Sequence, residues 1–383
     1  MLGRTSRVGF AVAAAVAVGL GTAGMAQAVV VQSHPVSTWQ TNGRVNVITV
    51  SGSTVYLGGL FTSLRPAGDP AGTGEVTRNH VAAVSLATGA LLPWNPNTNG
   101  SVRAIKVIGA NVYLGGSFTQ VGGKGHQRLA AVTAGTGAVV PTFTASASGE
   151  VFAMASSSGT LFVGGGFGTV DGTARANLAA VTSSTGAILP WSPTAAGQVR
   201  ALRFTGGTRL VVGGSFTGLN GGSQRDIGAV DSVTGASLPW KSSISYPVIG
   251  LASDAAGLYV AGAGGGGNFA AFDLTTGASL WQGGTNGNVQ AIGVVGGFVY
   301  LGGHFQTYCG PQHGQHTCTT PTPRNKLLAV DEKTGALQAW APGANSVLGV
   351  FALMGTSNGD MLAGGDFTSI GLRTQQGYAQ FTP

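Results

Sequence analysis

Short apolar runs alternate with glycine-rich turns along almost the whole chain. In one stretch the apolar residues 102–105 are followed by 112–116 and then by 129–132, and an equivalent stretch ends in the apolar residues 90–94. Runs of this length between turn residues are typical of β-strands. The pattern predicts a unit of four short strands, with 102–105 as an A strand, 112–116 as B, 129–132 as C and 90–94 as D.

This unit recurs along the sequence. The pair Gly58-Gly59 returns, usually within V-Y-L-G-G-x-F, at Gly115-Gly116, Gly164-Gly165, Gly213-Gly214, Ala261-Gly262, Gly302-Gly303 and Gly364-Gly365. A Thr-Gly pair, such as Thr136-Gly137, follows most copies and predicts a tight turn between strands C and D. Repetition at a period of about 50 residues indicates a solenoid, an array or a propeller. Four antiparallel strands per unit favour a propeller blade. We number the units repeats one to seven after their Gly-Gly copies.

The two ends of the chain complement each other. Repeat seven stops after residues 377–381, which match strand C, and residues 29–38 before Trp39 resemble the missing strand D. We therefore predict an all-β fold, a single seven-bladed β-propeller of four-stranded antiparallel blades over residues 29–383, with 29–38 completing blade seven. One aromatic residue per repeat is expected to pack between blades: Trp39, Trp94, Phe143, Trp191, Trp240, Trp281 and Trp340.

The motif V-Y-L-G-G-x-F-T-x-V-G-G at 112–123, followed by L-A-A-V-x-x-x-T-G-A, resembles the delta-60 repeat of bacterial exported β-propeller proteins. The resemblance covers essentially all of residues 29–383. The segment 229–240 is also similar to the repeat of pyrroloquinoline-quinone dehydrogenases. The delta-60 resemblance implies a propeller and an extracellular setting, and it carries no catalytic residues with it. Repeat five departs from it by lacking the F-T-x-V-G-G loop.

The N-terminal segment has the features of a secretory signal peptide. Arg4 and Arg7 precede the apolar run 8–18, and Ala26-Gln27-Ala28 offers a cleavage site. We predict that residues 1–28 are a signal peptide and that the mature protein is secreted and extracellular. The alternative is an uncleaved anchor, although the Ala/Gly-rich run is only weakly hydrophobic. No second apolar segment is long enough to span a bilayer, so no membrane span is expected after cleavage.

Composition narrows the function classes. Glycine accounts for 67 of 383 residues and charged residues for only 8%, which excludes a helical bundle and a solvated disordered chain. The net charge of +7 is spread along the chain. Nucleic-acid binding requires clustered basic residues, so no nucleic-acid partner is expected, and an anionic cell-surface polymer fits the charge better.

The loops that depart from the repeat indicate where function lies. Most B–C loops have the same length, but the steps from Phe61 to Val81 and from Phe305 to Leu327 are longer, in repeats one and six beside repeat seven. Loops on a rigid scaffold commonly bind ligands, so the B–C and D–A face beside these repeats is the predicted binding face. Its candidate residues are Arg65, Asp69, Arg78, His80, His304, Tyr308, His313, His316, Arg324 and Arg373.

Two sets of charged residues recur at fixed positions. Six of the seven B–C loops carry an arginine shortly before strand C, and these residues form either a cationic ring or structural donors to loop carbonyls or to an aspartate of their own blade: Arg78, Arg128, Arg175, Arg225, Arg324 and Arg373. Repetition at one position favours the structural interpretation. The carboxylates of Asp231, Asp273 and Asp331 precede the Thr-Gly turns and are expected to accept hydrogen bonds within them.

Cys309 and Cys318 bracket His313 and His316 in the insertion of repeat six. The pattern C-x3-H-x2-H-x-C has enough donors for tetrahedral zinc, but its spacing is unusual for zinc. In an exported chain two nearby cysteines favour a disulfide. We therefore predict a Cys309–Cys318 disulfide and no metal site.

The sequence lacks a convergent set of titratable residues, so we assign no catalytic residue and no cofactor. The favoured function is a secreted, non-enzymatic binding propeller that recognises a cell-surface glycan in the manner of a lectin, a cell-wall polymer or a partner protein, with membership of a secreted complex left open. The alternative is a propeller enzyme on the same face, either a quinone-dependent dehydrogenase or a lyase or hydrolase using His304.

Overall fold

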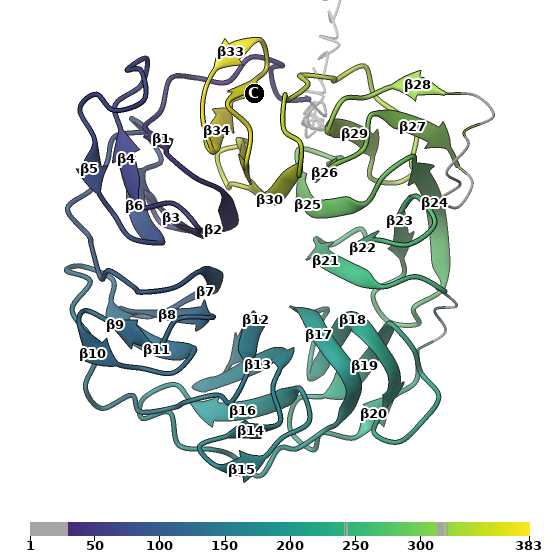
Figure 1. The fold of residues 1–383 in the computed structure, drawn as a ribbon. Coiled ribbons are helices and arrows are strands. Elements are labelled where there is room, and N and C mark those ends of the chain that lie inside the picture. The colour runs from purple at the N-terminus through teal and green to yellow at the C-terminus, as the bar shows by residue number, and fades with distance from the viewer. Residues whose placement is uncertain (1–29, 241, 243, 312–317, 319–320) are drawn as a thin grey trace, which may run out of the picture.

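The computed structural model describes residues 30–240, 242, 244–311, 318 and 321–383. In this part of the chain the backbone forms strands, turns and loops without any helix, so it also holds no helix that is long and apolar enough to cross a membrane. Small antiparallel sheets stand side by side in a ring, each with one strand toward the centre (Figure 1). The predicted signal peptide lies outside the described residues, as does Val29.

Each repeat contributes its A, B and C strands as antiparallel neighbours. In chain order these triplets are β2 (Val45–Ser51), β3 (Thr54–Gly59) and β6 (Val81–Ser85); β7 (Val102–Ile108), β8 (Asn111–Gly116) and β11 (Leu129–Thr133); β12 (Glu150–Ser157), β13 (Thr160–Gly166) and β16 (Leu178–Thr182); β17 (Ala195–Phe204), β18 (Arg209–Leu219) and β19 (Ile227–Asp231); β21 (Val248–Ser253), β22 (Leu258–Gly262) and β23 (Gly267–Phe272); β25 (Val289–Val295), β26 (Phe298–Gly303) and β29 (Leu327–Asp331); and β30 (Val350–Gly355), β31 (Met361–Gly365) and β34 (Tyr378–Phe381).

Strand D is much shorter than predicted. It forms a true strand only as β20 (Ser237–Leu238) and β24 (Ser279–Thr285). Elsewhere it is reduced to the isolated bridges Val84–Leu91, Val132–Val139, Val181–Ile188 and Val330–Leu337. A proline follows shortly after the bridge in most copies, as Pro93 does, and a proline cannot donate to the ladder. β24 has no proline and runs longest, but the copy at Leu337 also lacks one nearby, so proline explains most of the shortening rather than all of it.

The B–C loops form small hairpins. Three of them are β9 (Gln120–Val121) with β10 (Lys124–Gly125), β14 (Thr169–Val170) with β15 (Thr173–Ala174), and β32 (Ser369–Ile370) with β33 (Arg373–Thr374). In repeat one, β4 (Ser63–Arg65) pairs with β1 (Gln40–Thr41) and β5 (Val76–Thr77). In repeat six, β27 (Thr307–Gly310) and β28 (Thr322–Pro323) extend the sheet of repeat five through β24.

Both glycines of the repeated pair are explained by close packing. A Cβ on Gly58 would lie 2.7 Å from Cγ1 of Val102, the first residue of the next A strand, and a Cβ on Gly364 would lie 2.7 Å from Cγ1 of Val45. A Cβ on Gly59 would overlap the carbonyl oxygen of Arg44. The first glycine therefore admits the neighbouring repeat, and the second admits the carbonyl that precedes the A strand.

Neighbouring repeats contact each other through their A strands. β2 contacts β7, the series continues through β12, β17, β21 and β25 to β30, and β30 contacts β2. The N-terminal segment lies along β34, where Val36 bridges Gln380 and the Gln32 amide donates to the Thr382 carbonyl at 2.8 Å.

The repeated aromatic residues pack between repeats, as expected. The indole N–H of Trp94 donates to the Thr133 carbonyl of the next repeat at 2.9 Å, and that of Trp191 donates to the Asp231 carbonyl at the same distance. Tyr56 meets Trp94 edge to face with ring centroids 4.9 Å apart. Because these indoles are buried, they hold the ring together rather than offering a ligand platform. Trp39 is only half-buried, at the edge of the core of repeat one.

Candidate functional site

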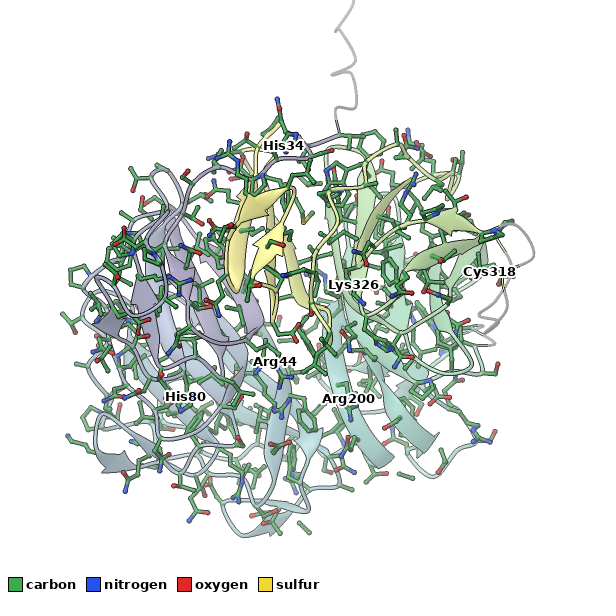
Figure 2. All side chains as sticks on the ribbon, turned by 45° about the horizontal axis from the view of Figure 1, so that its top comes forward. His34, Arg44, His80, Arg200, Cys318 and Lys326 are labelled. Atoms are coloured by element: carbon green, nitrogen blue, oxygen red, sulfur yellow. A yellow bond between two sulfur atoms is a disulfide. The ribbon has the colours of Figure 1, made fainter. Side chains whose placement is uncertain are left out.

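The inner ends of the A strands surround a cavity of about 220 Å³ on the axis of the ring. Each A strand supplies one side chain to it: Asn46, Arg103, Phe152, Arg200, Ile249, Gln290 and Phe351. These seven residues and Arg44 are called the axial mouth below. Figure 2 places Arg44 and Arg200 near the centre of the ring, with His80 and Cys318 away from it on opposite sides.

A β-bulge in every A strand turns these side chains toward the axis. Val102 pairs with Gly116 and Ala104 pairs with Gly115, which leaves Arg103 without a partner in the ladder. The same shift occurs in the other A strands at the corresponding residue. A bulge commonly re-aims a side chain. The repeated backbone therefore presents a set of side chains that do not repeat.

Positive charge accumulates at the axial mouth. Burial lowers the pKa of Arg200, the charge of Arg103 lowers it further, and Glu150 opposes the shift. Burial and the charge of Arg103 likewise lower the pKa of Arg44, opposed by Asp366. Arg103 and Glu150 form the one salt bridge among the described residues, at 3.6 Å, and both side chains are about one-third exposed. A pair this exposed is screened by water, so the repulsion between the guanidinium groups is only partly offset.

Aromatic rings and amide groups hold the arginines in place. The Arg44 guanidinium lies 4.5 Å from the centroid of the Phe351 ring. The guanidinium groups of Arg103 and Arg200 lie 5.7 and 5.2 Å from the centroid of the Phe152 ring. Arg44 also donates to Oδ1 of Asn46 at 2.9 Å. Such contacts restrain the guanidinium groups while leaving much of their hydrogen-bonding capacity available.

Exposed apolar side chains lie beside the axial mouth. Leu60, which follows the Gly-Gly pair of repeat one, is 44% exposed, and Val347 and Leu348, which precede β30, are 84% and 50% exposed. Asp366 fixes this loop by accepting hydrogen bonds from the Ser346 hydroxyl and from the Leu348 amide. The site therefore combines cations, rings and an apolar rim.

Two predicted binding residues, Arg65 and Asp69, make structural contacts within the insertion of repeat one. Arg65 is buried, and its guanidinium donates to the Asp69 carbonyl at 2.9 Å and to Oε1 of Gln376 at 2.8 Å. Asp69 is thus engaged through its backbone. Arg65 connects the insertion of repeat one to repeat seven and does not face solvent.

Other predicted residues support their own loops. Arg78 donates to the Thr77 and Leu92 carbonyls at 2.9 and 3.1 Å, and Arg324 donates to the two equivalent carbonyls of repeat six. His80 is half-buried with φ of 65°, directly before strand C, and burial lowers the pKa of its imidazole. Arg373 is exposed on β33.

The insertions of repeats one and six do not form one wall. β4 pairs with β1, toward repeat seven, whereas β27 extends the sheet of repeat five. Tyr308 packs against Phe269 of repeat five with ring centroids 6.3 Å apart. The two insertions therefore pack on different neighbours, and that of repeat six pairs with the edge of the long strand β24.

The remaining residues of the insertion in repeat six are partly described. The predicted Cys309–Cys318 disulfide is confirmed. His313 and His316 lie outside the described residues. His304 is half-buried, and burial together with the charge of Lys326 lowers the pKa of its imidazole. Among the residues that the structure describes, no group of three or more His, Cys, Asp or Glu side chains could hold a metal ion.

The axial mouth was not anticipated from the sequence, although a signal for it exists. In the A strands the residue after the first valine is Asn, Arg, Phe, Arg, Ile, Gln and Phe in turn, between positions that hardly vary. A position that varies inside a repeated strand marks a side chain that is not part of the scaffold. Loop length alone directed the prediction to the outer rim.

The architecture resembles solved propeller structures. The WD40 β-propeller domain of Doa1 superposes with a TM-score of 0.56 at 12% identity, over 91% of this chain and 97% of that chain. The chain has a β-propeller fold. The computationally designed Ika8 protein superposes with a TM-score of 0.54 at 16% identity, over 91% and 99% of the two chains. These identities show the fold alone. Neither a protein-family model nor a curated protein matches the sequence.

Proposed function

We propose that this protein is a non-enzymatic interaction propeller whose axial mouth binds an acidic segment of a partner protein. The observation that carries the proposal is the incompletely compensated charge of Arg44, Arg103 and Arg200 at one cavity. A bound carboxylate relieves the repulsion and accepts charge-assisted hydrogen bonds.

The apolar rim favours a protein over a polysaccharide as the partner. Leu60, whose amide donates to the Arg44 carbonyl at 2.8 Å, and Leu348, whose amide donates to the Asp366 carboxylate near Arg44, offer exposed apolar side chains in this region, as does Val347. Apolar side chains at the edge of a charged site fit a peptide that carries both acidic and apolar residues. An anionic cell-surface glycan, which the sequence alone also suggests, has little use for that rim.

The finer architecture belongs to the same proposal. We propose seven blades, closed by residues 30–38 along β34, and membership of the delta-60 repeat proteins. The contact of β30 with β2 and the bridge between Val36 and Gln380 support closure. The features of residues 1–28 support export, which makes a partner outside the cell or within a secreted complex the expected setting.

Binding of two labelled peptides tests the proposal: one alternates Glu and Leu, and its matched control alternates Gln and Leu. Wild type is expected to bind the Glu peptide preferentially, with an affinity that falls as salt is added. Replacing both Arg103 and Arg200 by Gln is expected to weaken binding at least tenfold, because a charged hydrogen bond contributes about 1.5–3 kcal/mol. The matched variant Arg373→Gln, on the same face but away from the axis, is expected to bind like wild type.

Two results would overturn the proposal. Equal affinity for the Gln and Glu peptides would remove the role of charge, and unchanged binding by the double variant would remove the axial mouth. Binding of an anionic polysaccharide in place of the Glu peptide would reassign the partner class while keeping the site.

A further inference from the structure

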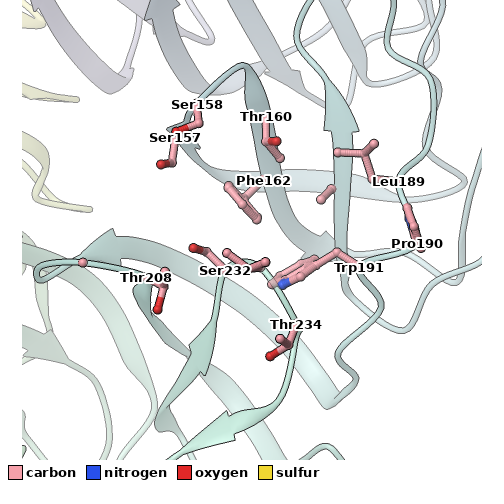
Figure 3. A pocket seen from close by; sticks show the side chains of 13 residues that line it. Ser157, Ser158, Thr160, Phe162, Leu189, Pro190, Trp191, Thr208, Ser232 and Thr234 are labelled. Atoms are coloured by element: carbon pink, nitrogen blue, oxygen red, sulfur yellow. The ribbon is translucent and has the colours of Figure 1, made fainter.

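A second cavity lies away from the axial mouth, on the face formed by the A–B and Thr-Gly turns. It measures about 550 Å³ and opens between repeats three and four (Figure 3). Its floor includes Phe162 and Trp191, and its rim includes turns of both repeats. Pockets that bind small molecules have volumes of about 300–1,000 Å³. No pattern in the sequence predicts a cavity on this face.

The cavity coincides with a substitution in the repeat. At the junctions before it, the B-strand tyrosine donates its hydroxyl to a carbonyl of the next repeat, Tyr56 to Ala134 at 3.4 Å and Tyr113 to Ser183 at 2.6 Å. At this junction the corresponding residue is Phe162, and Ser232 stands where Ser183 does. Phenylalanine has no hydroxyl, and no donor among the described residues reaches the Ser232 carbonyl. The junction thus lacks one hydrogen bond that the two preceding junctions have.

A longer turn widens the same junction. The A–B turn of repeat four contains Gly206 and Gly207, both with positive φ, and Gly207 lines the cavity. Val233, on the Thr-Gly turn opposite, is 72% exposed at the rim. A Trp floor, a glycine turn and an exposed apolar residue therefore surround the opening.

The lining has the chemistry of a site for a neutral, hydroxylated ring. It presents hydroxyl groups from Ser157, Ser158, Thr160 and Ser232, each able to donate and to accept, and from Thr208 and Thr234, which donate to the Asp231 carboxylate and are left as acceptors. Apolar contact comes from Phe162, Trp191 and their neighbours. No described residue of the lining is ionisable, and the Asp231 carboxylate beside it already accepts hydrogen bonds from Thr208 and Thr234, so a charged ligand would lose hydration without forming an ion pair in the lining.

We propose that this cavity, here named the Phe162 pocket, binds a neutral pyranose unit of a glycan. The apolar face of the sugar packs on Phe162 and Trp191, its hydroxyl groups exchange hydrogen bonds with the Ser and Thr side chains, and one of them donates to the Ser232 carbonyl. The site is independent of the axial mouth, which selects an anion on the other face.

The variant Phe162→Tyr tests the Phe162 pocket with the repeat's own residue. The added hydroxyl is expected to bond the Ser232 carbonyl, as Tyr113 bonds Ser183, and to fill the site that the sugar hydroxyl uses. Binding of methyl glucoside, methyl galactoside and methyl mannoside, measured by calorimetry or ligand-detected NMR, is expected to fall at least tenfold. The melting temperature is expected to stay equal or rise, which separates lost binding from lost folding.

Two further variants complete the test. Tyr113→Phe removes the equivalent hydroxyl one junction earlier and is expected to lower the melting temperature without changing sugar binding. Thr160→Val keeps the side-chain shape but removes a lining hydroxyl, and is expected to weaken sugar binding. The Arg103 and Arg200 double variant is expected to bind sugar like wild type, so failure of either site can be recognised separately.

The proposal is overturned if wild type binds none of the three glycosides, or if Phe162→Tyr folds and binds them as wild type does. It is also overturned if a simple phenol such as p-cresol binds while the sugars do not, because the pocket would then recognise an aromatic ring.

Discussion

The carboxyl groups of Glu332 and Asp254 lie together between repeats six and five. Burial raises the pKa of Glu332 to about 7, and its hydrogen bond with Asp254 and the charge of Asp254 add to the shift. Between its ordinary pKa, about 4.5, and 7 the folded state holds a proton that the unfolded state releases. This group's contribution to stability is therefore greatest at low pH and declines as the pH rises toward 7.

The variant Glu332→Gln is expected to remove this decline. Its melting temperature should exceed that of wild type at pH 8 and approach it near pH 5, as measured by thermal unfolding across that range. Glu75→Gln is the matched control, because hydrogen bonds from Ser63 and Gly72 hold the pKa of Glu75 below its ordinary value. That control is expected to gain nothing at pH 8, and an equal gain in both variants would contradict the assigned cause.

Residues with a fixed role in every repeat were predictable from the sequence. The Thr234 amide donates to the Asp231 carboxylate at 2.7 Å, as expected for a turn acceptor. The partners of Arg78 are loop carbonyls of its own repeat, the structural alternative that repetition favoured. Residues of the axial mouth differ from strand to strand, so their roles cannot be derived from repetition. The bulges in neighbouring A strands bring Arg103 and Phe152 together.

At the scale of the elements, the Gly-Gly pair of each B strand lies against the bulged A strand. A Cβ on the second glycine would overlap a carbonyl that lies just before the bulge, as for Gly214 and Gln198. The second glycine thus lets the A strand approach the B strand closely beside the bulge that turns the axial side chains. The existence of both strands was predictable, but the bulge was not, because no residue type marks it.

Gly214→Ala is expected to be strongly destabilising for this reason. Relief of the overlap requires a shift of the backbone, and overpacking of this kind costs about 1–3 kcal/mol. Denaturant unfolding measures the difference. The control Gly125→Ala lies on β10, where an added Cβ meets no atom within 4 Å, and is expected to change stability by less than about 0.5 kcal/mol. Equal effects of the two variants would show that the carbonyl contact is not the cause.

In strand D, packing between repeats outweighs the tendency of the sequence to form a full strand. Its apolar residues predicted a full strand, yet a single bridge remains in four repeats. The apolar side chains are instead explained by junction packing, since the strand ends in an aromatic residue such as Trp94 that must reach the next repeat. Burial between repeats and pairing within a sheet give the same apolar pattern, and the sequence does not separate them.

At the scale of the whole molecule, residues 32–36 lie beside residues 380–382. Val31 is only 3% exposed and its amide donates to the Tyr300 hydroxyl at 3.0 Å, while the Trp340 indole donates to the Gln32 carbonyl at 3.1 Å. Trp94 and Tyr56 make the corresponding contacts within continuous chain. The contacts of Val31 and Gln32 with repeat six resemble those that the end of strand C makes at other junctions, which supports the proposed closure.

Comparing chains that begin at residue 30 and at residue 40 tests how much this junction contributes. Loss of residues 30–39 removes the buried Val31 side chain, which is worth about 1.5–3 kcal/mol, and several hydrogen bonds worth about 0.5–1.5 kcal/mol each. It also exposes the edge of β34, a surface on which a second chain can pair. The shorter chain is expected to melt at a lower temperature and to form oligomers or aggregates by light scattering. If it instead remains monomeric with the melting temperature of the longer chain, the ends do not close the ring, and the contacts of β30 with β2 alone hold the first and last repeats together.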